Sequence, residues 1–155
     1  MRTTYRVLAY LVALGVVVQA AAIAFAYFGL GKWIEDGGVL DKATIESQSA
    51  EFDGVLGFAV HGIAGQMVIP VIALLLLIVS FFARIPGGIL WAGIVVVDTA
   101  VQVLLGMFGH GIAGIGLLHG LNALILFAVA AIAAQRATTA AAPAPPATPD
   151  RAGVA

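Results

Sequence analysis

Four long apolar stretches dominate this chain, and each is long enough to cross a lipid bilayer as a helix. A membrane-spanning helix needs about 20 predominantly apolar residues. The stretches lie at residues 7–30, 55–83, 88–107 and 112–134, and a polar segment, residues 31–53, separates the first two. The pattern predicts an all-α integral membrane protein with four transmembrane helices.

The composition supports the same class. The chain has 155 residues, of which 62% are hydrophobic and 10% charged, and its mean hydropathy is +1.10. That apolar share exceeds what a soluble domain of this size uses for its core, so we expect the excess to face lipid. A net charge of -1 with seven Lys and Arg gives no basic surface for nucleic acid. The absence of cysteine excludes disulfides and thiolate chemistry.

Short connections determine the expected topology. Residues 84–87 and 108–111 join the last three stretches, so these helices are expected to be antiparallel neighbours in an up-down-up-down bundle. The arginines favour one side of the membrane, because cytoplasmic loops carry an excess of Lys and Arg. We therefore expect both termini in the cytoplasm of a protein of the cell membrane. The expected cytoplasmic residues are Arg2, Arg6, Arg84, Arg136 and Arg151, against Lys32 and Lys42 on the other side.

The two ends of the chain need separate interpretation. Arg2 and Arg6, followed by an apolar run and Ala-x-Ala spacing, also fit a signal peptide, but a run of this length favours a retained helix. Residues 1–136 are therefore assigned to one transmembrane domain. Residues 137–155 are rich in Ala and Pro and predict a disordered cytoplasmic tail.

Two of the three histidines lie inside the apolar stretches, where ionisable side chains are costly and mark functional sites. His61 and His119 are on the second and fourth stretches, which run in the same direction and lie diagonally in such a bundle. Each is about seven residues from its outer end, or roughly 10 Å at 1.5 Å per residue. The imidazoles are therefore expected to meet at one level and to bind the iron of one haem b. His110, at the membrane edge, is expected to meet solvent or the cofactor's outer edge.

Small residues beside the two histidines favour close approach of a flat macrocycle. Gly57 and Gly65 are four residues either side of His61 on one helix face, and Gly116 is three residues before His119. We assign these glycines to the cofactor site. The alternative is that they allow tight helix packing, because membrane interfaces are rich in small residues.

One amide side chain on each helix is expected near the histidines. These amides could hydrogen-bond the imidazole nitrogens that do not bind iron and so fix the tautomer of each ring. Alternatively, they could join the helices through hydrogen bonds worth about 1 kcal/mol each. Pro70 removes the hydrogen bond to the carbonyl of Gln66, so a kink is expected just below His61. The four amides are Gln19, Gln66, Gln102 and Asn122.

Asp98 is the only acidic residue in the four stretches and lies near the membrane midplane. An ionised carboxylate there costs about 2.5 to 3.5 kcal/mol on insertion scales. Asp98 is therefore either a neutral, hydrogen-bonded group that holds the bundle together or a proton or ion site.

Two resemblances follow from these residues. His61 and His119 on alternate helices resemble the four-helix core of membrane b-type cytochromes, in which histidines on paired helices hold haem. The runs His61-Gly-Ile-Ala-Gly, Ser80-Phe-Phe-Ala-Arg-Ile-Pro-Gly-Gly and Leu118-His-Gly-Leu-Asn-Ala also resemble small uncharacterised bacterial four-helix membrane proteins, over residues 5–136.

The resulting hypothesis is a single-haem electron carrier rather than an enzyme, with bis-histidine ligation near the outer face. Its expected partners are the lipid bilayer, a redox protein or membrane complex, and a second copy of the chain. The alternatives are a cofactor-free structural or accessory membrane subunit, and a small transporter that uses Asp98. No phosphate-binding loop or serine triad supports a nucleotide enzyme or hydrolase.

Overall fold

A computed structural model describes residues 1–139, and this part of the chain is helical without strands. Four of its helical segments are long and apolar enough to cross a membrane. They are α1 (Arg2–Glu35), the continuous run of α3 (Leu56–Ile63), a π-helical segment η1 (Ala64–Val68) and α4 (Ile69–Ala83), then α5 (Gly88–Gly109) and α6 (Ala113–Thr139). A short helix, α2 (Lys42–Ser47), lies in the segment between α1 and α3.

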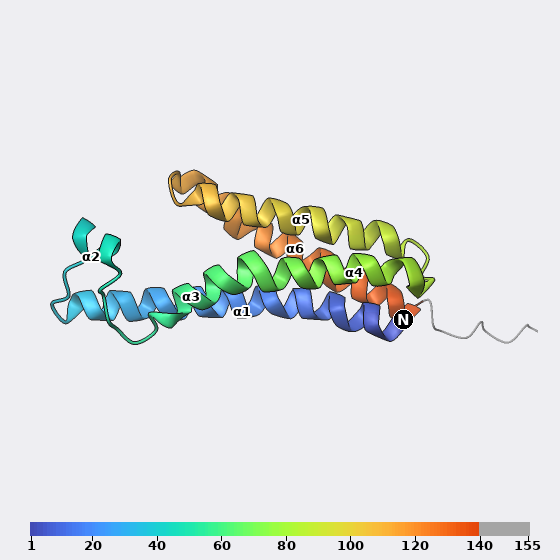
Figure 1. Ribbon diagram of the computed structural model, residues 1–155, viewed down its shortest axis with the longest axis horizontal. Coiled ribbons are helices and arrows are strands. Elements are labelled where there is room, and N and C mark those ends of the chain that lie inside the picture. The colour runs from blue at the N-terminus through green and yellow to red at the C-terminus, as the bar shows by residue number, and fades with distance from the viewer. Residues whose placement is uncertain (140–155) are drawn as a thin grey trace, which may run out of the picture.

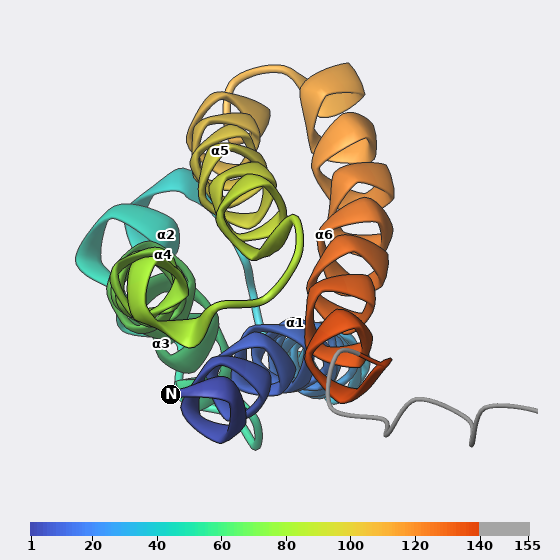
Figure 2. The same ribbon diagram turned by 90° about the vertical axis from the view of Figure 1, so that its right-hand side faces the viewer.

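The long helices lie side by side around a narrow core (Figures 1 and 2). Helix α1 contacts α4 and α6, and α5 contacts the same two. Viewed along the bundle, α4 and α6 therefore lie on opposite sides, and so do α1 and α5 (Figure 2). The core is built mainly from small side chains, including Ala9, Ala73, Ala92 and Ala130, which let the helices approach closely.

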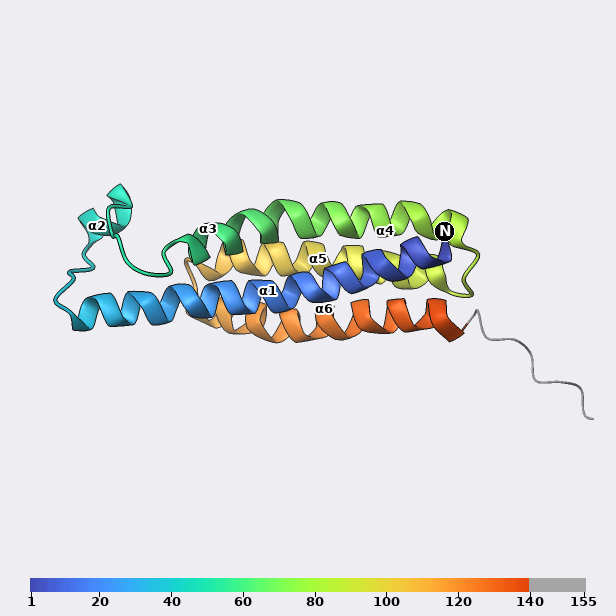
Figure 3. The same cartoon turned by 90° about the horizontal axis from the view of Figure 1, so that it is seen from below.

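One end of the bundle gathers arginines, and we call it the arginine end. Arg2 donates a hydrogen bond of 3.2 Å to the carbonyl oxygen of Arg84, and the Arg136 guanidinium lies 4.7 Å from the ring centroid of Trp91. The buried Tyr5 hydroxyl donates to the carbonyl of Gly88 at 3.0 Å. The amino end of α1, the α4–α5 connection and the carboxyl end of α6 therefore lie together (Figure 3).

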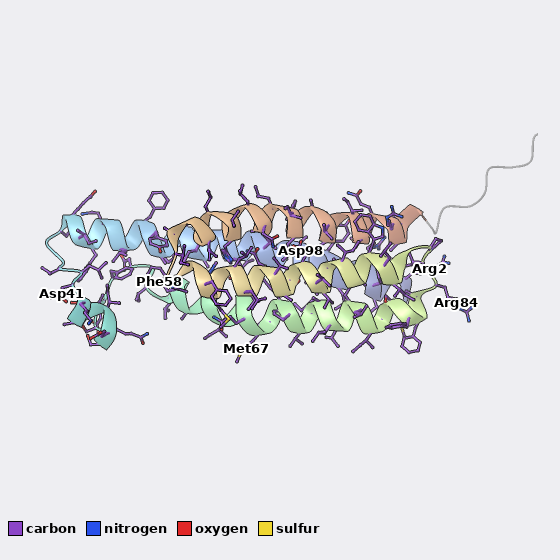
Figure 4. The ribbon with its side chains drawn as sticks, turned by 90° about the horizontal axis from the view of Figure 1, so that it is seen from above. Arg2, Asp41, Phe58, Met67, Arg84 and Asp98 are labelled. Carbon is purple, nitrogen blue, oxygen red and sulfur yellow. The ribbon has the colours of Figure 1, made fainter. Side chains whose placement is uncertain are left out.

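The opposite end carries the polar segment and α2, and Asp41 marks it in Figure 4. Asp41 caps α2 by accepting a hydrogen bond from the Thr44 backbone N–H at 2.8 Å. Hydrogen bonds from the backbone and side chain of Thr44 lower the pKa of Asp41. Aromatic rings connect the segment to the helices: Trp33 and Phe52 have centroids 6.1 Å apart, and Phe52 and Phe58 6.3 Å.

The helices differ from the predicted stretches mainly at their ends. Helix α1 has 34 residues and extends beyond the other helices toward α2 (Figure 3), because residues 31–35 continue the helix after the apolar run ends. Helix α6 continues to Thr139, so the predicted tail does not begin at residue 137. Residues 135–139 contain no proline to stop the helix. The rest of the predicted tail, residues 140–155, is outside the described residues.

The deformation predicted near Pro70 takes the form of a π-helical turn. The backbone N–H of Ile69 donates to the carbonyl of Ala64, five residues earlier. Proline lacks the N–H that would continue an α-helical pattern at the next position. Such π turns are rare and frequently occur at functional sites, and this one begins three residues after His61.

Gly57 provides a test of the packing between α1 and α3. A Cβ placed at Gly57 would lie 2.3 Å from the Ala22 carbonyl oxygen, a backbone atom that cannot move alone. We predict that Gly57→Ala lowers the free energy of unfolding by about 1 to 3 kcal/mol, the usual cost of overpacking. Denaturation of the purified protein, followed by circular dichroism, measures the change.

Gly62, on the same helix, is the matched control. A Cβ at Gly62 meets no atom within 4 Å, so Gly62→Ala should leave stability unchanged or raise it by up to about 1 kcal/mol through helix propensity. Equal stabilities for the two alanine variants would contradict the described packing.

Candidate cofactor site

The structure brings His61 of α3 and His119 of α6 together between opposite helices of the bundle. Their ring centroids are 6.0 Å apart and their planes are inclined by 70°. Both side chains are half-buried. Two residues separated by 58 positions in the sequence thus form one pair of imidazoles.

Each imidazole is oriented by a backbone carbonyl of a neighbouring helix. His61 Nδ1 lies 3.1 Å from the carbonyl oxygen of Gln19 on α1. His119 Nδ1 lies 3.0 Å from the carbonyl oxygen of Gln102 on α5. These carbonyls can accept a second hydrogen bond because each oxygen has two lone pairs. The histidine pair therefore involves all four long helical segments of the bundle, with His61 on α3, His119 on α6 and their carbonyl partners on α1 and α5.

These contacts determine the tautomer of both rings. A carbonyl oxygen only accepts, so Nδ1 must carry the proton in each histidine. In the neutral ring this leaves a lone pair rather than a proton on Nε2, which is the form that binds metals; in His119 a ligand there would compete with the Gln102 amide, 3.4 Å away. Hydrogen bonding from the other ring nitrogen to a backbone carbonyl is the usual support of a metal-ligating histidine.

The amides of Gln102 and Asn122 surround His119. Gln102 Nε2 donates to the backbone carbonyl of His119 at 3.1 Å and also lies 3.4 Å from His119 Nε2. Asn122 Nδ2 donates to Gln102 Oε1 at 2.9 Å. The sequence predicted hydrogen bonds from amide side chains to the imidazoles. The Gln102 amide lies within hydrogen-bond distance of His119 Nε2, while the partners of both Nδ1 atoms are main-chain carbonyls.

Gln19 occupies the corresponding place beside His61. Its side chain is 9% exposed, and its Nε2 lies 3.4 Å from the carbonyl oxygen of Val60. Its Oε1 is buried and has no hydrogen-bond partner among the described residues. Gln66, by contrast, is exposed in η1 and forms no hydrogen bond with either imidazole in this part of the chain.

The three glycines proposed for the site lie in different surroundings. A Cβ at Gly65 would be 3.1 Å from Gln19 Oε1, so this glycine leaves space next to the histidine pair. Gly57 instead faces Ala22 and Ala26 of α1, and Gly116 lies against Gly109 at the α5–α6 connection. The contacts of Gly57 and Gly116 are those expected of helix packing, the alternative that the sequence also allowed.

Gly106 is a site residue that the sequence reasoning missed. A Cβ there would lie 3.0 Å from His119 Cε1 and 3.1 Å from its Nδ1, so a larger residue would displace the ring. Gly106 is four residues after Gln102 and shares its helix face. The four-residue spacing between Gln102 and Gly106 could therefore have indicated this residue from the sequence alone.

The pair supplies two candidate ligands. No group of three or more His, Cys, Asp or Glu side chains able to hold a metal occurs within residues 1–139. His110 ends α5 and is exposed at the connection to α6. Two protein ligands are the number that a six-coordinate, bis-histidine haem takes.

The spacing of the rings fits one metal atom between them. A metal bound by imidazole lies about 2 Å from the nitrogen, and two rings with centroids 6.0 Å apart can hold one such atom. Gly106 lets the His119 ring pack closely against α5, and Gly65 lets the Gln19 side chain pack against the second long helix. The donor set and the spacing are therefore compatible with bis-histidine haem.

Comparison of the chain with protein-family models, curated proteins and solved structures found no match. The resemblances to b-type cytochromes and to small four-helix membrane proteins therefore stay predictions. Function is inferred below from this chain's own residues.

The tautomer assignment can be tested by nitrogen NMR of the haem-free protein with ¹⁵N-labelled histidine. We predict that His61 and His119 both have a protonated Nδ1 and an unprotonated Nε2, because their Nδ1 partners are carbonyl oxygens. His110, which is exposed, serves as the reference. A protonated Nε2 with a bare Nδ1 on either buried ring would contradict the observed contacts.

Proposed function

We propose that the chain is a multi-pass protein of the cell membrane with up-down-up-down topology and both termini in the cytoplasm. Its four long apolar helices support membrane insertion. The gathering of Arg2, Arg84 and Arg136 at one end supports the orientation, because positively charged residues are enriched on the cytoplasmic side. The segment that contains α2 would then face outward.

We further propose that this protein carries one haem b, held by His61 and His119, and transfers electrons. The observation that carries the proposal is the pair of opposed imidazoles, each with Nδ1 within hydrogen-bond distance of a carbonyl oxygen. In a neutral ring that contact leaves Nε2 as the nitrogen able to bind a metal. When bound, haem supplies reversible uptake of one electron. Its axial ligands and their hydrogen bonds are the means by which a protein adjusts that chemistry.

The surrounding residues have separate roles in this proposal. The carbonyls of Gln19 and Gln102 orient the rings, and the hydrogen bond increases the basicity of each ligand. Asn122 holds the Gln102 side chain through its Oε1. Gly65 and Gly106 keep space free near Gln19 and His119.

The depth of the site favours electron exchange on the side that carries α2. His119 is six residues from the start of α6, which places it roughly 9 Å from that end of the helix at 1.5 Å per residue. A redox protein or membrane complex in contact with this end would approach the site more closely than one at the arginine end.

A cofactor-free structural subunit is the second candidate, and one observation favours it. The histidine-to-carbonyl hydrogen bonds join α3 to α1 and α6 to α5, so the same contacts would fasten the bundle without any ligand. In that case the role of the two histidines would be to hold the helices together through interhelical hydrogen bonds.

The visible absorption spectrum of the purified full-length protein separates these candidates. We predict a Soret band that responds to reduction, with one haem per chain. His61→Ala and His119→Ala should each abolish low-spin binding, because each removes one of two axial ligands. A colourless wild-type protein expressed with adequate haem supply would reject the proposal in favour of the structural subunit.

His110→Ala is the matched control. His110 is followed by the same Gly-Ile-Ala-Gly sequence as His61 but is exposed at the α5–α6 connection. The control should therefore retain the wild-type spectrum. Loss of the band in all three variants would indicate a general effect on folding rather than ligation.

A further inference from the structure

Asp98 is an acidic side chain for which the electron-carrier proposal gives no role. It lies on α5 between the two ends of the bundle (Figure 4) and lines a groove of about 600 Å³ between α5 and α6. Its Oδ2 atom is buried without a hydrogen-bond partner among the described residues. The other residues that line the groove are Ile89, Leu90, Gly93, Ile94, Val97, Val101, Asn122, Ile125 and Val129.

The groove supplies no counter-charge for Asp98. None of its lining side chains is basic, and Asn122 is the only other polar one. The neighbouring α4 contains no titratable residue. On α6, the titratable groups are His119, which lies beyond Gln102, and Arg136, which stacks on Trp91 near the arginine end. A carboxylate in such surroundings is costly, and no fixed positive charge among the groove's lining residues holds Asp98 in its ionised form.

Two amide side chains lie between Asp98 and the histidine pair. Asn122 lines the same groove as Asp98 and donates to Gln102 Oε1 at 2.9 Å. Gln102 Nε2 in turn lies 3.4 Å from His119 Nε2. Two amides thus separate the Asp98 carboxyl from His119, a proposed iron ligand. Neither amide carries a charge that would screen the carboxyl from the histidine site.

From this arrangement we infer that Asp98 is a proton-binding site coupled to the redox state of the histidine site. The inference rests on the proposed haem function. Addition of one electron makes the site one unit more negative, and charges interact strongly in surroundings of low dielectric constant. The ionised carboxylate becomes less favourable, so Asp98 takes one proton from solvent for each electron that the site takes from an external reductant. Oxidation releases both.

The experiment is a redox titration of the full-length protein in lipid nanodiscs at a series of pH values. The wild-type midpoint potential should fall as pH rises, by up to about 59 mV per tenfold change in proton concentration for one proton per electron. Asp98→Asn should remove the dependence, because the amide keeps the size of the side chain but does not titrate. Asp98→Glu, which keeps the carboxyl, should retain it.

Controls distinguish this inference from other sources of pH dependence. His110→Asn removes an exposed titratable group and should leave the slope unchanged. If the Asp98→Asn variant fails to fold, the reduced-minus-oxidised infrared spectrum of the wild type gives the answer, since a protonated carboxyl has a distinct carbonyl stretch. Haem b also carries two propionate carboxyls, so the band is assigned by labelling with ¹³C-aspartate, which shifts an aspartic acid band but not a propionic acid band. Asp98 is the only acidic residue in the four apolar stretches, so a shifted band protected from rapid solvent exchange reports on it.

Failure of the inference is distinguishable from failure of the haem proposal. A haem-containing wild type whose midpoint potential does not change with pH, or an Asp98→Asn variant with an unchanged slope, overturns the role of Asp98 and leaves the haem in place. A wild type without haem overturns both.

Discussion

In the membrane setting proposed above, the polar side chains between these apolar helices must find their partners within the protein. Water cannot satisfy them in hydrocarbon, and each unsatisfied group costs several kcal/mol. Here His61 and His119 use backbone carbonyls of α1 and α5, and Gln102 and Asn122 use one another. These bonds connect opposite helices through their neighbours and leave His61 Nε2 and His119 Nε2 as the ring nitrogens for a ligand, the latter with the Gln102 amide 3.4 Å away.

The π-helical segment η1, which interrupts the second long helix, determines which of its side chains face the histidine site. A π turn carries an extra residue relative to an α-helical turn, so residues on either side of η1 do not follow a single helical face. His61 precedes the turn and faces His119, while Gln66 within it is exposed. Pro70, near the start of α4, lacks the N–H of a regular turn.

Helical spacing was enough to predict the approach of the two histidines. The positions of the apolar stretches give the register of each helix, and a rise of 1.5 Å per residue then gives the depth of any side chain. His61 and His119 were expected at one level on diagonal helices, and their ring centroids lie 6.0 Å apart. Apolar length likewise indicated where α4 ends and α5 begins, because the turn at residues 84–87 interrupts both patterns.

The remaining details depended on features without a sequence signature. Every residue has a carbonyl, so nothing marked those of Gln19 and Gln102 as the Nδ1 partners. The face of Gln66 could not be read from α-helical periodicity because the π turn changes it. Gly57 and Gly65 looked equivalent around His61, but α1 crosses at Gly57 and places Ala22 against it. Such crossings are a property of the assembled bundle.

The central claim is that one iron is bound by both imidazoles, and electron paramagnetic resonance of the oxidised wild-type protein tests it most directly. The account predicts a low-spin ferric signal typical of two imidazole axial ligands. A high-spin signal, which indicates that one axial position lacks a histidine, or the absence of any haem iron signal, would contradict it.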